Sequence, residues 1–78
     1  MSNTATPGQD YTFTATINDV DKLELFMDGS AVGYSSLRDL GNDEYEITIA
    51  GVDVDCPGPF EAKEDGVLIH KADVSPCP

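Results

Sequence analysis

Two cysteines are the residues of this 78-residue chain that could most readily form a covalent link. The long interval between Cys56 and Cys77 fits neither a zinc knuckle nor a Cys-x-x-Cys redox pair. A disulfide between them would stabilise the fold by about 3 kcal/mol in the chain-entropy model. The alternative is two free thiols in a reducing cytosol. Mass measured with and without reductant separates these two hypotheses.

Two aspartate pairs could contribute to a calcium site. Asp19 and Asp21, and likewise Asp53 and Asp55, place carboxylates in turn-rich segments, and hard cations need several oxygens gathered from loops. Neither pair completes an EF-hand, because Leu23 stands where the third oxygen is needed and the obligatory glycine is missing. A composite calcium site, for which Asp53 and Asp55 are weak candidates, therefore competes with ordinary exposed turn aspartates.

The single histidine, His70, has no serine or cysteine nearby at the spacing of an activated nucleophile. Within an expected strand over 67–71 it shares a face with Leu68 rather than with Val67 and Ile69, which favours a partly exposed strand residue. The chain also lacks a strong metal-ligand spacing and a phosphate-binding loop. We therefore expect a protein without catalytic residues or cofactors, acting through a binding surface.

The composition is acidic, with 15 aspartates and glutamates, 4 lysines and arginines and a formal net charge of −11. Such a chain would be repelled by phosphates, so we expect no direct binding to nucleic acid. The charge fits a well-solvated surface, a basic protein partner, cation binding or a salt-adapted source.

No stretch approaches the roughly 20 apolar residues of a membrane span. The first four residues have neither the basic end nor the apolar run of a signal peptide. We expect no membrane span, and we favour a virion or extracellular location over the cytoplasm, which is the alternative.

Alternating side chains predict the elements that must position these residues. Over 10–17 the apolar Tyr11, Phe13 and Ile17 alternate with threonines, and 44–50 has the same period of two, which is typical of strands. The expected strands are 10–17, 22–27, 31–36, 44–50, 60–63 and 67–71. The segments 37–43 and 51–59 are expected as connections and 73–78 as a tail. This pattern predicts an all-β fold, a small antiparallel β-sandwich or partly open barrel of about six strands.

We expect a flexible N-terminal lead over 1–9 and a single β domain over 10–78. If the six strands run alternately up and down, Cys56 and Cys77 fall at the same end of the domain. The same counting places the turn aspartates in two groups. Asp19 and Asp21 share one end with Asp39, Asp43 and Asp65, whereas Asp53 and Asp55 share the other with Asp28.

Phe26 is the first candidate for an interface. It lies opposite Leu23, Leu25 and Met27 on its strand, so it is exposed if those three residues face the core. Tyr34 could join it across a tight hairpin at Asp28-Gly29. The alternative is that both faces of the sheet are covered and that Phe26 simply packs.

The stretch 23–33, LELFMDGSAVG, followed by NDEYEITI at 42–49, resembles the immunoglobulin-like modules of bacterial surface proteins and tailed-phage virions. This resemblance implies an immunoglobulin-like sandwich used for adhesion, spacing or decoration, with no catalytic residues to carry over. The chain departs from the pattern by its six expected strands, where seven are usual. It also lacks the buried tryptophan and inter-sheet cysteines of antibody domains.

These observations predict a non-enzymatic binding or structural module, an accessory of a virion, as capsid decoration or tail, or of an extracellular surface. Its partner would be a protein, such as a virion shell or a basic surface. The interface candidates are Phe26, Tyr34, Asp19, Asp21 and Asp43. The alternative is an acidic inhibitor that mimics nucleic acid and binds a host-defence or DNA-handling protein.

Overall fold

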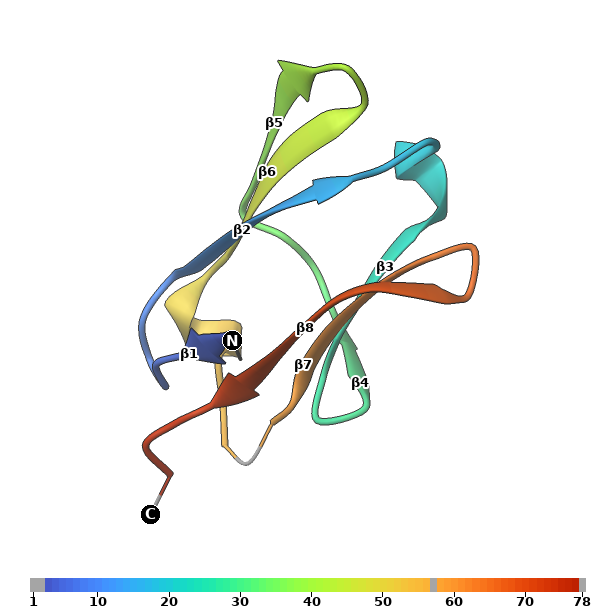
Figure 1. Ribbon diagram of the computed structural model, residues 1–78. Helices are drawn as coiled ribbons and strands as arrows, with labels where there is room; N and C mark the ends of the chain where they lie inside the picture. Colours follow the sequence, from blue (N-terminus) through green and yellow to red (C-terminus); the bar gives the residue numbers. More distant parts are fainter. Residues whose placement is uncertain (1–2, 57, 78) are drawn as a thin grey trace.

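The computed structural model describes residues 3–56 and 58–77, which form two β-sheets (Figure 1). Five strands pair in the order β1-β8-β7-β3-β4, and three pair in the order β2-β6-β5. The strands are β1 (Thr4–Ala5), β2 (Tyr11–Thr16), β3 (Leu23–Met27), β4 (Ser30–Val32), β5 (Ser36–Gly41), β6 (Glu44–Ile49), β7 (Phe60–Glu64) and β8 (Val67–Val74), with short 3-10 helices η1 (Val20–Lys22) and η2 (Gly51–Asp53). The all-β, two-sheet fold is confirmed, with eight strands in the described residues instead of about six.

The core lies between the two sheets, where the period of two in the sequence predicted it. Phe13 of β2 and Ile47 of β6 point inward from the smaller sheet, and Leu25 and Phe60 do so from the larger one. Phe60, Ile47 and Ile49 are completely buried. Burying such side chains contributes about 1.5–3 kcal/mol each, which is why the alternating segments became the central strands.

The segment expected as a connection over 37–43 contains a strand, so this prediction was wrong. β5 pairs antiparallel with β6, and the turn between them has positive φ at Asn42 (54°) and Asp43 (64°), as tight hairpins need. The expected strand over 31–36 ends early at Val32. The chain then crosses from the larger sheet to β5 of the smaller one (Figure 1). β5 is an edge strand with little apolar surface, so its sequence carried no alternation to detect.

The expected flexible lead also differs from the structure. Thr4 and Ala5 form β1, which pairs in parallel with the end of β8, and Ala5 is only 1% exposed. The amides of Asp73 and Ser75 donate hydrogen bonds to the carbonyls of Asn3 and Ala5 at 2.9 and 3.0 Å. The pairing explains why β8 continues to Val74, beyond the expected end of its strand. Met1 and Ser2 lie outside the described residues.

Backbone hydrogen bonds define two ends of the sandwich. At the first, the Ile17 amide donates to the Asp43 carbonyl at 2.8 Å, and the Asp65 amide donates to the Lys22 carbonyl at 3.1 Å. We call this the Asp43 end. At the opposite end, the Asp28 amide donates to the Pro59 carbonyl at 3.0 Å. We call this the Asp28 end. The prediction that Asp43 and Asp65 share one end and Asp28 lies at the other is therefore confirmed.

A disulfide joins Cys56 and Cys77 at the Asp28 end, with Cα atoms 5.7 Å apart. Cys56 precedes β7 and Cys77 follows β8, so one complete hairpin lies between them. An antiparallel hairpin returns the chain to the end where it began, which brings the two sulfurs together. The predicted disulfide is confirmed.

Candidate functional site

Phe26 lies on the outer face of the five-stranded sheet. Its neighbours on β3, Leu25 and Met27, are buried, so the Phe26 side chain points away from the core. Across the strands it stands opposite Ala31 of β4 and Glu61 of β7. The Phe26 ring remains half-buried, and the Lys63 ammonium lies 5.4 Å from its centroid, within cation–π range. Phe26 is thus available on the surface but partly covered.

Tyr34 joins Phe26 in one surface hollow, as the sequence suggested. The hollow has a volume of about 290 Å³ and is lined by segments 23–26 and 31–34, including Glu24 and Ala31. Tyr34 is 48% exposed, and Gly33 beside it has no side chain to fill the space. Glu24, Phe26 and Ala31 face outward, so we call this the outer hollow.

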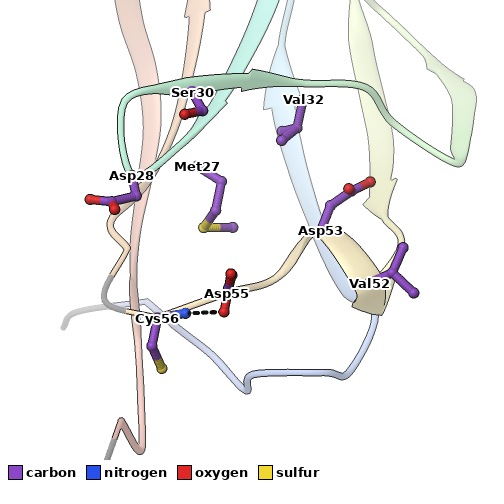
Figure 2. A pocket seen from close by; sticks show the side chains of 8 residues that line it. All are labelled: Met27, Asp28, Ser30, Val32, Val52, Asp53, Asp55 and Cys56. Atoms are coloured by element: carbon purple, nitrogen blue, oxygen red, sulfur yellow. Dashed lines mark hydrogen bonds between the residues drawn. The ribbon is translucent and has the colours of Figure 1, made fainter.

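A second hollow lies at the Asp28 end and was not predicted from the sequence. It has a volume of about 260 Å³ between strands β3 and β4 and the segment 52–56. Met27 and Val32 supply apolar surface, and Figure 2 shows the Met27 side chain in the middle of the hollow with the Asp55 carboxylate pointing toward it. Its lining residues are Met27, Asp28, Ser30, Val32, Val52, Asp53, Asp55 and Cys56. We call it the acidic hollow, because three of these residues are aspartates.

The edge of β4 separates the two hollows, since Val32 lines both. β4 ends the order of its sheet, so no strand among residues 3–56 and 58–77 pairs with its outer side. Natural edge strands are usually protected by charges, proline or a bulge. The free edge of β5 carries Arg38 and Asp39, whereas residues 29–37 around β4 contain no charge and no proline. The strand β4 itself therefore carries no charged residue or proline that would protect its edge.

The other interface candidates lie at the opposite end of the molecule. Asp19 caps η1 by accepting a hydrogen bond from the Asp21 amide at 3.1 Å, and the Asp43 carbonyl binds the Ile17 amide. The structure therefore does not bring Asp19, Asp21 and Asp43 together with Phe26 and Tyr34. Their turn contacts give them structural roles, and an interface role for them stays a prediction.

No three acidic, histidine or cysteine side chains in residues 3–56 and 58–77 gather closely enough to hold a metal ion. Asp53 and Asp55 both line the acidic hollow, but the Asp55 carboxylate accepts the Cys56 amide at 2.9 Å (Figure 2). The composite calcium site considered for these two residues is therefore not assembled in this arrangement.

The predicted face of His70 was wrong, because a β-bulge changes the register of β8. Ala62 pairs with His70 and the next residue, Lys63, pairs with Leu68, so Ile69 is the extra residue. His70 therefore lies on the inward face of the sheet, like its partner Ala62. Leu68 lies on the outward face, like its partner Lys63. The alternation of apolar and polar residues does not reveal a bulge, because the extra residue changes which face the later side chains occupy.

His70 contacts β2 of the opposite sheet, where a hollow of about 480 Å³ is lined by Tyr11, Phe13 and His70 among others. The Tyr11 hydroxyl and His70 Nε2 share a hydrogen bond of 2.6 Å. Burial lowers the pKa of His70 below 6.5 and raises the pKa of Tyr11 above 10.0. The pair links the two sheets.

The chain matches no protein-family model, no curated protein and no solved structure in our comparisons. In the part of the chain that the structure describes, no helix has the length and apolar character needed to span a membrane.

Proposed function

We propose that this protein is a non-enzymatic β-sandwich module that binds a protein partner. The observation that carries the proposal is the exposed, uncharged edge of β4, which lies between the outer hollow and the acidic hollow. Exposed strand edges and apolar hollows are features through which β domains recognise other proteins. Phe26 and Tyr34 supply aromatic surface of the kind that anchors interfaces.

We further propose that the module serves a virion or an extracellular surface. The Cys56–Cys77 disulfide supports this setting, because disulfides persist mainly in oxidising environments. The resemblance of residues 23–33 and 42–49 to immunoglobulin-like modules points the same way, since such modules decorate or space surface structures. The two-sheet architecture is compatible with that resemblance.

The second candidate function is an acidic inhibitor that mimics nucleic acid, which the net charge of −11 favours. A mimic needs its carboxylates arranged like successive phosphates along one surface. Here Asp28, Asp53 and Asp55 gather at one end, whereas Asp43 and Asp65 lie at the other. This division favours the binding module.

A photo-reactive amino acid in place of Tyr34 would identify the partner in the native source. Leu40, on β5, is a matched control position because it is also exposed, at 40%, but lies on the smaller sheet. We expect a covalent adduct with a structural protein from position 34 and not from position 40. We expect part of this adduct to remain at about 1 M salt, where the Debye length is only about 3 Å, because contacts with the aromatic surface are not screened.

An adduct with a basic DNA-handling protein that disappears at high salt would support the mimic instead. Equal labelling from positions 34 and 40, or none from position 34, would contradict the proposed binding surface.

A further inference from the structure

We propose that the free edge of β4 binds an extended, basic segment of the partner by strand addition. In this arrangement the segment becomes a sixth strand of the larger sheet, with its side chains directed alternately toward the outer hollow and the acidic hollow. The inference rests on the proposed binding function and specifies the mode of binding and the chemistry of the partner.

The β3–β4 hairpin determines which backbone groups face the open edge. Its two turn residues, Asp28 and Gly29, have φ of 53° and 80°, so Met27 and Ser30 flank a two-residue turn and form a hydrogen-bonded pair. Antiparallel ladders alternate hydrogen-bonded and non-hydrogen-bonded pairs, so the pair Phe26–Ala31 is of the second kind. The N–H and C=O of Ala31 therefore point away from β3, toward the open edge.

An independent contact agrees with this alternation. The amide of Asp28 donates to the Pro59 carbonyl at 3.0 Å, on the β7 side of β3. The amide of the preceding residue, Met27, must then face β4, as the hairpin assignment requires. Ala31 thus offers one donor and one acceptor to an incoming strand.

The two hollows lie where alternate side chains of an added strand would fall. Successive side chains in a strand point to opposite faces. On the outward face of the sheet, Phe26 and Ala31 line the outer hollow. Facing inward, Met27 and Val32 line the acidic hollow. One set of side chains would meet an aromatic surface and the other a methionine-lined space with carboxylates.

The charges select a basic segment. Asp28, Asp53 and Asp55 line the acidic hollow, and Glu24 lines the outer hollow, so an alkyl stem ending in a cation fits both the apolar and the acidic groups. A second copy of the chain is disfavoured as the occupant, because each copy carries a formal charge of −11. The occupant is therefore a strand with alternating basic and apolar residues from another protein.

An eight-residue peptide of alternating lysine and valine, with blocked ends, tests the proposal on the disulfide-bonded protein. We expect saturable shifts in the backbone NMR signals of residues 30–34 at peptide concentrations up to about 1 mM. A peptide with glutamate in place of lysine should produce no saturable shifts. Two further peptides carry N-methyl groups on every second amide, one at the odd positions and one at the even positions. One of them should bind at least tenfold more weakly and the other should be affected much less, because only alternate amides face the edge.

Ala31→Pro removes the edge-facing N–H without removing a β3–β4 hydrogen bond, whereas Ala31→Ser retains it. We expect at least tenfold weaker peptide binding for the proline variant and near-normal binding for the serine variant. The two N-methylated peptides make the same comparison on the native chain if the proline variant does not fold.

Strand addition would be overturned by the absence of saturable shifts with the lysine peptide, by equal binding of both N-methylated peptides, or by self-association through β4. The photo-crosslinking experiment at position 34 separates this failure from failure of the proposed function. If Ala31→Pro still captures the same partner at position 34, the binding module stands and strand addition falls.

Discussion

The imidazole of His70 lies flat against the ring of Phe13, with ring centroids 4.3 Å apart and planes inclined by 9°. The contact joins β8 of the larger sheet to β2 of the smaller one. His70 also shares a hydrogen bond with Tyr11, so a single side chain links the sheets by stacking and by a polar contact. The register change at Ile69 places His70 in this position.

Replacing His70 should alter how stability depends on pH. Burial lowers the pKa of His70 in the folded state, so the unfolded state binds the proton more readily below pH 6.5. The contribution of neutral His70 is complete above that pH and is lost as the pH falls toward the lower pKa of the folded state. We expect the free energy of unfolding, measured with urea, to fall more between about pH 7.5 and 5.5 in the native protein than in His70→Gln. Equal decreases would contradict this role.

Removing the disulfide should reduce the free energy of unfolding by about 3 kcal/mol. The double variant Cys56→Ser, Cys77→Ser tests this by denaturant unfolding. Reductant should destabilise the native protein by a similar amount and leave the double variant unchanged, which provides the control. Because Cys56 lies beside Asp55 in the acidic hollow, binding of the lysine–valine peptide should weaken as well. A variant as stable as the native protein would contradict the prediction.

Gly51→Ala should destabilise the fold by about 1–3 kcal/mol, because a methyl group there has no space. A Cβ at Gly51 would lie 2.5 Å from the backbone oxygen of Gly8, whereas one at Gly33 would meet nothing within 4 Å. Gly33→Ala is therefore the matched control and should change stability little. Thermal unfolding of both variants measures the difference. Equal effects would show that the segment before β2 moves away at little cost.

Glu64→Ala should lower the free energy of unfolding by about 1 kcal/mol. The Glu64 carboxylate accepts the Asp19 amide at 2.8 Å and the Asn18 amide at 3.1 Å, so it holds the turn that follows β2. Glu44→Ala, at an exposed position of β6, controls for loss of negative charge. Urea unfolding should show a loss for Glu64→Ala alone, and the same loss in both variants would assign the effect to net charge.

The sequence by itself indicated the all-β class and the central strands, because alternation over 10–17 and 44–50 directs one face of each strand inward. It also predicted the disulfide, and this prediction survived the unforeseen strand β5. Only the β7–β8 hairpin separates Cys56 from Cys77, so the number of earlier strands does not matter. The sorting of turn aspartates also held, because β4 and β5 both run from the Asp28 end toward the Asp43 end.

Tertiary structure decided the edges of the sheets and the candidate site. β1 and β5 contain little apolar alternation and form because a neighbouring strand offers unpaired backbone groups, which no local pattern reveals. Phe26 and Tyr34 were candidates from the sequence, but the acidic hollow needed segment 52–56 to lie beside β4. The bulge at Ile69 turned His70 inward. Local periodicity reports which face of a strand is buried, whereas the partner of each edge and the spaces between segments depend on contacts distant in sequence.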